Sequence, residues 1–463
     1  MENSKSMIKD LTTGSVPKKL ITFAYPFMLS NLLQVVYNLV DMIVIGRVVG
    51  SRGLSGVSNG GDLLQFCTML CVGFASAGQI MISQAVGKRD HEGINSIIGT
   101  MFTAILSFSI LLSIVAIRLT DTFLGWLQTP GEAFDQARDY SIVCFAGLFF
   151  VYGYNVVSSI LRGMGDSMRP FVFIAIAAVV NLLLDLLFIA VMGMEAFGAA
   201  LATVIGQAVS FIISIIYLYR RREAFGFDFK PRSFAPRFKI LLPMIKLGFP
   251  LALQHAAINI SMLFVNSYVN AYGLVASAVT GVGNKLRQVM SIITRAIATA
   301  GSSMVGQNMG AGKPERVKQM VKTASIICFA SAIAFSAVFL LFPKQIFSLF
   351  DKNPEVLDWA PRYMITVAIA FVSFAFMSPF NAVINGTGFA LLSFVIAIVD
   401  GVVSRIGLSL LLGITFNMGI EGFWYGSALA SYMTGIIGCI YYFSGKWKSR
   451  KLLVNDLGDQ GER

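Results

Sequence analysis

The chain has 463 residues, of which 56% are hydrophobic and only 13% are charged, and its mean hydropathy is +0.73. A soluble domain carries about 25% charged residues, so this composition excludes an ordinary soluble protein and indicates a chain that resides in a bilayer. The formal net charge of +12 requires no nucleic-acid partner, because anionic lipid and basic cytoplasmic loops account for it.

Twelve apolar runs, each long enough to span a bilayer as an α-helix, follow one another along the sequence. They begin near Leu20, Leu54, Asn95, Arg138, Met168, Ala196, Ile240, Val275, Met320, Arg362, Phe389 and Gly422. The runs are continuous rather than alternating, which favours helices over a membrane β-barrel. Residues 1–19 are too polar for a signal peptide, so we expect the first run to remain as a helix. The predicted fold is an all-α integral membrane protein.

The sequence repeats itself over about half its length. Residues 75–87 return as residues 298–310 with Ala, Gly, Met and Gln at matching positions, and residues 161–165 return as 384–388. A period this long excludes a solenoid of short repeats. We therefore expect two pseudo-symmetric six-helix lobes, residues 1–222 and residues 240–463 with a cytoplasmic tail, joined by a cytoplasmic linker over residues 223–239.

Basic residues are distributed unevenly over the predicted loops. Most of the 36 lysines and arginines fall in the N-terminal segment, the linker and the other loops on one side of the predicted spans. Because Lys and Arg resist translocation, that side is predicted to be cytoplasmic. The expected protein is a multi-pass component of the inner (plasma) membrane with both termini in the cytoplasm.

Four acidic residues lie inside the predicted spans, where burial of a carboxylate costs at least ~2.5 kcal/mol and marks a candidate functional group. These residues are Asp41, Asp62, Asp185 and Asp400. Counting from the span ends places the first three at one depth near the outer surface. Asn181 lies one helical turn from Asp185 on the same face.

Thr203 and Tyr140 fall near the same depth and complete a predicted polar cluster in the first lobe with Asp41, Asp185 and Asn181. Two carboxyl groups held close together can share a proton, or they can bind a bare Na⁺ with Asn and Thr oxygens. We interpret the cluster as a site for a coupling ion, with Asp41, Asp185 and Asn181 as the candidate Na⁺ ligands. No other cofactor is expected.

The simpler alternative is that an acid near a helix end reaches the interface or pairs with a base such as Arg47. The repeat argues for a specific role, because the second half has Val265, Ser404 and Leu408 at the positions that match Asp41, Asn181 and Asp185. The predicted cluster therefore belongs to the first lobe only.

The second half instead places bases inside its predicted spans, namely Lys285, Arg287, Arg295 and Arg405. These bases can bind an anionic group of a substrate, or they can snorkel to the interface or pair with Asp400. His255, beside Gln254, can line a cavity or serve packing. We expect Asp62, His255 and the four bases to face a substrate cavity.

The sequence offers little support for catalysis. The five cysteines occur in apolar runs without metal-binding spacing, which is typical of small core residues. No nucleotide-binding loop, zincin motif or nucleophile elbow is present, so we expect no enzymatic activity.

Several motifs together resemble those of the multidrug and toxic compound extrusion (MATE) family. They include Pro26, Gln34, YNLVD at residues 37–41, LRGMGD at 161–166, NxxxD at 181–185 and QNMGAG at 307–312. The resemblance covers nearly the whole chain and agrees with the expected two groups of six helices.

This resemblance implies two lobes around a central V-shaped cavity and export of amphipathic, often cationic, drugs or metabolites against an H⁺ or Na⁺ gradient. Asp41, Tyr140, Asn181, Asp185 and Thr203 match the first-lobe cation network of the DinF-like prokaryotic branch. Gln34, Tyr37 and Asn155 match cavity residues. Another branch of the family carries acids on the seventh and tenth helices, and this chain has none there. We expect a monomer that contacts membrane lipid.

Pro26 and Pro250 occupy matching places in the first and seventh spans, and each removes a helix hydrogen bond. Only Pro26 shares its helix with a predicted intramembrane acid, Asp41. Pro26 is therefore the predicted hinge that responds to the coupling ion.

Two other functions fit the sequence less well. A flippase of the same superfamily for pyrophosphate-linked lipid or oligosaccharide precursors would explain the basic residues, but such proteins usually have more than twelve helices. A membrane-bound enzyme would need a nucleophile or metal cluster that the motifs do not supply.

Overall fold

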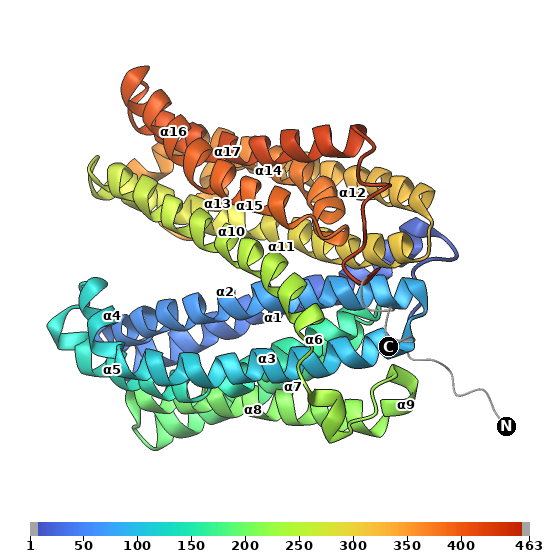
Figure 1. Cartoon of the computed structure of the whole chain (residues 1–463). Helices are drawn as coiled ribbons and strands as arrows, with labels where there is room; N and C mark the ends of the chain where they lie inside the picture. The colour runs from blue at the N-terminus through green and yellow to red at the C-terminus, as the bar shows by residue number, and fades with distance from the viewer. Residues whose placement is uncertain (1–7, 456–463) are drawn as a thin grey trace. The chain divides into compact units, whose positions relative to one another are not determined.

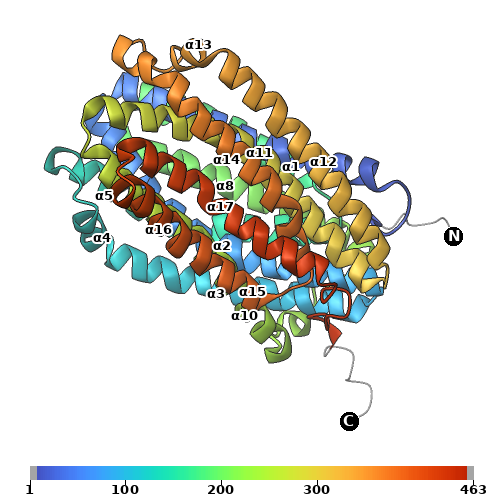
Figure 2. The same cartoon turned by 90° about the horizontal axis from the view of Figure 1, so that it is seen from above.

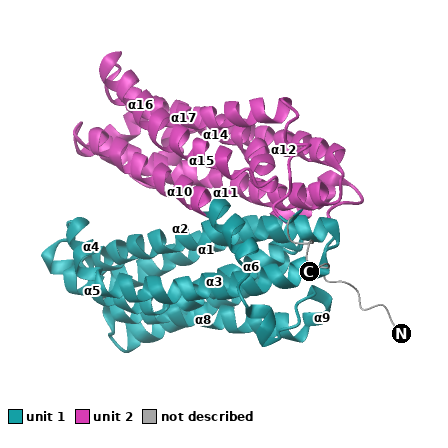
Figure 3. Cartoon of the chain, in the orientation of Figure 1, with its two compact units in different colours: residues 1–10, 25–248, 454–463 teal, residues 11–24, 249–453 magenta. Residues whose placement is uncertain are grey.

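The computed structural model describes residues 8–455, and the regular elements of this part of the chain are all helical. Two compact units can be distinguished, drawn in teal and magenta in Figure 3. Unit 2 comprises Leu11–Ala24 and Phe249–Leu453, and the other described residues form unit 1.

Unit 1 is a bundle of long helices joined by short connections (Figure 1). Its elements are α1 (Val16–Val48, from Tyr25 onward), α2 (Ser51–Lys88), α3 (His91–Arg118), α4 (Thr120–Trp126), α5 (Gly131–Ala146), α6 (Leu148–Gly163), α7 (Met168–Asp185), the π-helix η1 (Leu186–Val191), α8 (Glu195–Arg220), α9 (Arg222–Phe225) and the 3₁₀-helix η2 (Pro231–Phe234).

Unit 2 repeats this pattern of long helices. Its elements are α10 (Phe238–Asn270, from Phe249 onward), α11 (Leu274–Gly310), α12 (Pro314–Leu341), α13 (Pro343–Phe347), α14 (Pro354–Gly386), α15 (Ala390–Ile398), the π-helix η3 (Val399–Ser404), α16 (Arg405–Leu410), the π-helix η4 (Leu411–Thr415) and α17 (Gly419–Phe443). Helix α14 packs against α11, α12 and α17, and Figures 1 and 2 show these helices running alongside one another.

The helices account for the twelve predicted spans. Ten helices of the described chain are long and apolar enough to cross a membrane, and the bent pair α5 and α6 makes an eleventh. Helix α17, with 25 residues, corresponds to the last predicted run. Each predicted starting residue lies inside its helix or, for Phe389, directly before it.

The bend in the fourth span has a steric cause. Helices α5 and α6 meet at an angle of 50° around Gly147. A Cβ atom at Gly147 would lie 2.4 Å from the side chain of Val204 on α8, so only glycine allows this close approach. The bend lets α5 and α6 pack separately against α8.

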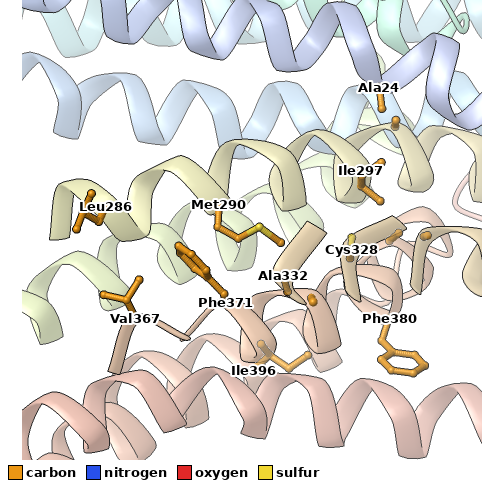
Figure 4. Close-up of a cluster of buried hydrophobic side chains, with 14 of the residues drawn as sticks. Ala24, Leu286, Met290, Ile297, Cys328, Ala332, Val367, Phe371, Phe380 and Ile396 are labelled. Atoms are coloured by element: carbon orange, nitrogen blue, oxygen red, sulfur yellow. The ribbon is translucent and has the colours of Figure 1, made fainter. Parts of the chain in front are cut away.

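The core of unit 2 consists of aliphatic and aromatic side chains from its three central helices (Figure 4). Met290 of α11, Phe371 of α14 and Ala332 of α12 are fully enclosed. These side chains are removed both from water and from lipid, so van der Waals packing between the helices holds the unit together.

The predicted linker is a packed part of unit 1. The segment between α8 and α10 lies against α3 so closely that a Cβ atom at Gly99 would sit 1.6 Å from the carbonyl oxygen of Ser233. Thr103 donates a hydrogen bond to the carbonyl of Phe234 at 2.5 Å. The Ser233 hydroxyl holds the pKa of the exposed Asp228 carboxyl below its usual range.

The units also differ from the predicted lobe boundaries at the start of each half. Leu11–Ala24, which includes the first part of α1, belongs to unit 2 although it lies in the predicted first lobe. Residues 240–248 belong to unit 1 although they lie in the predicted second lobe. Helices α1 and α10 each therefore change unit along their length, directly before Pro26 and Pro250. The predicted cytoplasmic position of the two termini concerns chain ends that lie outside the described residues.

Candidate functional site

The two acids with the strongest sequence argument are neighbours in unit 1. Asp41 lies on α1 and is half-buried, and Asp185 is the last residue of α7 and is fully buried. Their carboxyl groups interact directly. Asn181, one turn before Asp185, donates its amide nitrogen to Asp41 Oδ1 at 3.1 Å. The predicted depth and the one-turn spacing therefore bring the three residues together.

Thr203 joins this group through its backbone. Its N–H donates to the amide oxygen of Asn181 at 3.3 Å. Gly206, one turn further along α8, makes this approach possible, because a Cβ atom there would lie 3.1 Å from the carbonyl oxygen of Ala177 and 3.3 Å from the Cβ of Asn181. Helices α7 and α8 thus hold Asn181 between Asp41 and a backbone donor.

Tyr140 of α5 also reaches the site, as predicted from its depth. Its ring packs on Gly60 of α2, where a Cβ atom would lie 2.6 Å from the ring. The nearest polar neighbours of its hydroxyl group include Cys144, Asp41 and Tyr37. Tyr37 of α1, predicted as a cavity residue, lies close to both carboxyl groups of the pair.

The helix carrying Asp185 changes its winding at this residue. Helix α7 ends at Asp185, and the chain continues as the π-helix η1. Single π-helical turns inside α-helices are frequently found at functional sites. Unit 2 has a π-helix at a similar place in its fifth span, η4, but Leu408 replaces the acid there. The backbone irregularity is repeated, and the acidic chemistry is confined to unit 1.

One oxygen of this acidic pair has no partner. Asp185 Oδ1 is buried and makes no hydrogen bond with the described residues. A buried acceptor that lacks a partner costs about 1–3 kcal/mol, and more when it is charged. A proton or cation placed between the two carboxyl groups would remove this cost.

Asp62 is exposed rather than enclosed among the helices of unit 1, and its predicted place in a substrate cavity stays a prediction. The direction of Asp62 around the axis of α2 explains its exposure. Helix α2 packs on α5 through Gly60, and a residue two positions later points about 200° away at 3.6 residues per turn. Asp62 therefore faces away from Tyr140.

Two further predicted cavity residues stand apart from the acidic pair. Gln34 is exposed on α1. Asn155 is half-buried on α6, where its amide nitrogen donates to the carbonyl of Val151 one turn earlier, at 2.8 Å.

The fourth intramembrane acid belongs to a separate network in unit 2. Asp400, in η3, accepts a hydrogen bond from Arg405 at 2.9 Å and one from Thr434 at 2.8 Å. Arg405 also donates to the Ser427 carbonyl at 2.9 Å and to Ser431 Oγ at 3.1 Å. Both charged side chains are almost completely enclosed. The predicted alternative that a base pairs with Asp400 is thus correct for Arg405.

The other bases divide into one buried and two exposed side chains. Arg287 is 7% exposed, one turn from Gly283, where α11 touches the ring of Tyr363. Lys285 is exposed, because it points about 200° away from both Gly283 and Arg287. Arg295 is exposed and donates to Ser291 one turn earlier. The exposure of Lys285 and Arg295 does not decide whether they line a substrate cavity, so that expectation stays a prediction.

His255 is also exposed, and its predicted role in lining a substrate cavity stays a prediction. Helix α10 meets η3 through Ala257, which lies close to Gly401. His255, two positions earlier, points toward the opposite side of α10.

Sequence reasoning missed several polar residues that complete these groups. Thr434 binds Asp400, and Cys144 lies beside Tyr140. Asp166 is fully buried in the loop before α7, where it accepts from Arg169 at 2.6 Å and from the backbone of Met168 at 3.1 Å. The motif LRGMGD contained the only sequence signal for Asp166. Thr434 and Cys144 belong to no motif with a distinctive spacing.

The sequence model of the MatE family matches this chain twice, over residues 26–187 and 250–411. The first stretch lies in unit 1 and the second in unit 2, and each begins at the proline where its first helix enters that unit. The double match confirms the predicted duplication.

Similar proteins cover almost the whole chain. The probable multidrug resistance protein YpnP of Bacillus subtilis is 28% identical over 96% of this chain and 99% of its own length. The probable multidrug resistance protein NorM of Thermotoga maritima is 22% identical over 95% of each chain.

Solved structures of a MATE protein show the same fold. Its straight and bent conformations each superpose with a TM-score of 0.87 at 23% identity, covering 96% of this chain and 100% and 99% of theirs. The likeness confirms a multi-pass membrane protein with twelve helices in two pseudo-symmetric lobes. Because the family match extends over well more than half of the sequence, the chain belongs to the MatE family.

Proposed function

We propose that this protein is a cation-coupled antiporter that exports amphipathic, often cationic, drugs and toxic compounds by alternating access. Family membership and the multidrug resistance proteins among its relatives support the transport of small molecules. The acidic pair in unit 1 supplies the coupling site, as in the DinF-like branch.

The observation that carries this proposal is the partnerless oxygen of Asp185. Asp41 and Asp185 are neighbours, Asn181 donates to Asp41 and not to Asp185, and Asp185 Oδ1 is left without a hydrogen bond. A structural role would not require a second carboxylate at this point. A group that must bind and release a cation during each transport cycle does require an acceptor that is free in one state.

The donor set suits a proton better than Na⁺. Hard cations are bound by several oxygen ligands. Asn181 turns its amide nitrogen toward Asp41 and its oxygen toward the Thr203 backbone, so binding of Na⁺ by this amide would require the amide to turn over. A proton needs only the two carboxylates. We therefore assign H⁺ as the coupling ion.

Protonation would replace the repulsion between Asp41 and Asp185 with a hydrogen bond, and α1 would respond because Asp41 lies on it. We propose that Pro26 is the hinge, since α1 changes unit directly before this proline. A solved MATE protein of the same fold has been seen in a bent and in a straight conformation, which supports a fold with two states. If the drug and the proton favour different shapes, entry of one drives release of the other.

We further propose that Gln34, Tyr37 and Asn155 contact the exported compound. They lie in unit 1, and Tyr37 links this region to the acidic pair. The protein would act as a monomer in the plasma membrane, with both termini in the cytoplasm because the basic loops lie on that side.

The alternative function is a flippase for pyrophosphate-linked precursors. It rests on the four bases in the predicted spans of the second half. Arg405 is neutralised by Asp400, so only three of these bases remain to make a cavity cationic.

The proposal is tested by reconstitution of the full chain in liposomes with an imposed pH gradient or Na⁺ gradient. We expect a pH gradient to drive movement of the cationic dye ethidium and a Na⁺ gradient alone to have little effect. Asp41→Asn and Asp185→Asn should abolish the gradient-driven movement.

Asp139→Asn is the matched control, because Asp139 is an exposed acid of the same unit that is not among the predicted site residues. It should retain most of the parental rate. Undiminished transport by either Asp41→Asn or Asp185→Asn, with normal insertion, would contradict the assigned coupling site. Movement driven by Na⁺ alone would contradict the choice of H⁺.

A further inference from the structure

Unit 1 has a groove on its surface that lies away from the acidic pair. It is bounded by residues 102–110 of α3, residues 211–216 of α8, and Phe229 and Phe234 of the linker, and its volume is about 490 Å³. Ligand sites have volumes of roughly 300–1,000 Å³. Thr203, at the level of the acidic pair, precedes the start of the groove on α8 by eight residues and so by about 12 Å. The groove is therefore a separate feature, next to the linker.

Hydrocarbon side chains dominate the lining of the groove. Nine of the eleven lining residues are phenylalanine, leucine or isoleucine. Of the two hydroxyl groups, that of Thr103 is already engaged, because it donates to the carbonyl of Phe234 at 2.5 Å. Few polar groups are left to orient a polar ligand, so the groove suits a hydrocarbon chain.

The walls of the groove are fixed by close packing within unit 1. The ring of Phe211 lies on Gly153 of α6, where a Cβ atom would be 2.5 Å from the ring. At the linker, the rings of Phe229 and Phe234 pack around Phe227, with centroids 4.6 Å and 5.2 Å from its own. The groove is therefore bounded by aromatic surfaces that are already in place without a ligand.

The groove is open along one side. Ile110 of α3 and Ile212 and Ile216 of α8 belong to its lining and are each about half exposed. Exposed aliphatic surface on helices that span a membrane is stabilised by contact with acyl chains rather than water. A lipid chain can therefore enter the groove from this side.

An arginine stands at the linker end of the open side. Arg220 follows Ile216 by four residues on α8, as Ile216 follows Ile212, so the three side chains form one stripe. Side chains of an α-helix lean toward its N-terminus, which directs the exposed side chain of Arg220 toward the groove.

The linker adds a second arginine at the same end. Arg232 lies in η2, between Phe229 and Phe234, and is exposed. Neither Arg220 nor Arg232 forms an ion pair with any residue that the structure describes. Residues 220–239 as a whole include seven basic and two acidic residues, a net charge of +5. The linker end of the groove therefore favours an anionic group.

We propose that the groove binds one anionic phospholipid, with an acyl chain between α3 and α8 and the phosphate and headgroup at Arg220 and Arg232. A phospholipid combines the two properties that the groove requires, a hydrocarbon chain and an anionic group at its end. Because the linker is predicted to be cytoplasmic, the lipid would come from the cytoplasmic leaflet, which contains anionic lipid. Its binding would fasten the linker to unit 1 at the membrane surface, independently of the coupling site.

The test titrates the purified full-length protein, in a neutral detergent, with dioleoyl phosphatidylglycerol or dioleoyl phosphatidylcholine and measures the lipid-bound fraction by native mass spectrometry. We expect the first phosphatidylglycerol to bind more tightly than the first phosphatidylcholine. Each base near an anionic lipid contributes about fivefold, so Arg220→Gln combined with Arg232→Gln should weaken phosphatidylglycerol binding about 30-fold. Binding of phosphatidylcholine should not change.

Arg118→Gln is the matched control, since Arg118 is an exposed arginine at the opposite end of α3. This variant should bind phosphatidylglycerol as the wild type does. Equal affinity of the wild type for the two lipids would overturn the proposal, as would a preference that survives in the double variant.

A second comparison tests the groove itself. Ser107, a lining residue of α3, is replaced in Ser107→Trp by a side chain that fills the groove, and this variant should lose phosphatidylglycerol binding although both arginines remain. Val179→Trp, at an exposed position of α7 outside the groove, should keep it. Glycerol 3-phosphate, which has the anionic group but no chain, should not compete. Unchanged binding in Ser107→Trp, or displacement by glycerol 3-phosphate, would show that the arginines bind phosphate without the groove and would reject the lipid site.

Discussion

Two residues that lie two positions apart on the same helix can have opposite surroundings in this protein. Gly60 and Asp62 on α2, and Arg287 and Lys285 on α11, form two such pairs. In each pair one residue faces a neighbouring helix and the other is exposed. The chemistry available to a charged side chain is thus decided by its angle around the helix as much as by its depth.

The buried pair Asp400 and Arg405 allows a quantitative prediction. Asp400→Asn or Arg405→Met alone should destabilise the protein by about 3–5 kcal/mol, because each leaves a buried charge uncompensated. The double variant Asp400→Leu with Arg405→Met should cost less than the sum of the two. Denaturation midpoints of the purified protein measure all three. Additive losses would show that the two side chains do not stabilise each other.

The acidic pair could be predicted from the sequence because the positions of its residues follow from counting along single helices. The depth of Asp41 and Asp185 follows from counting along a helix, and the proximity of Asn181 to Asp185 follows from the helical repeat. Exposure of Asp62, Lys285, Arg295 and His255 depends on which face each helix turns inward. That choice is made by close contacts such as those of Gly60, Gly283 and Gly401, which involve partners far away in the sequence.

The helices likewise include features that the sequence predicts and features that it does not predict. The twelve spans were predictable because an apolar run of this length has few other structures in a bilayer. The bend at Gly147 and the π-helices η1 and η4 were not, because they arise from local winding and packing between helices. The packing of the linker against α3 was not predicted either, because the many basic residues of the linker indicate a solvated loop.

The contact between α3 and the linker predicts a specific effect of Gly99→Ala. The new Cβ atom would meet the Ser233 carbonyl at 1.6 Å, so the segment must move and Thr103 should lose its bond to Phe234. We expect faster trypsin cleavage in the linker and a stability loss of about 1–3 kcal/mol. Gly61→Ala, at a glycine with open space around it, should leave the cleavage rate unchanged. Equal cleavage of both variants would contradict a packed linker.

The two prolines provide a test of the hinge. Helices α1 and α10 both change unit directly before a proline, but only α1 carries an acid of the coupling site. Pro26→Ala should therefore impair dye export more than Pro250→Ala at equal expression, because restoring the helix hydrogen bond favours one shape of α1. Equal losses, or a loss only in Pro250→Ala, would exclude α1 as the responsive helix.

At the scale of the whole molecule, the duplication supplies two similar scaffolds with different charges. Unit 1 contains an acidic pair with a partnerless oxygen, and unit 2 contains the buried ion pair of Asp400 and Arg405. The family match over residues 26–187 and 250–411 shows that the helices were repeated. The polar residues that we assign to function are not repeated in the other half.

Orientation in the membrane follows from the distribution of basic residues and can be measured directly. In a variant without the five native cysteines, Lys230→Cys in the linker should resist a membrane-impermeant thiol reagent added to intact cells. Lys352→Cys, exposed in the loop before α14, should react. The opposite labelling pattern would reverse the predicted topology.

The central claim is that Asp41 and Asp185 hold a proton that the exported compound displaces. The most direct test is proton release when ethidium is added to the purified protein in weakly buffered detergent solution with a pH-sensitive dye. We predict release from the wild type and from Asp139→Asn, and none from Asp41→Asn or Asp185→Asn. Release that is the same from all four proteins would contradict the claim.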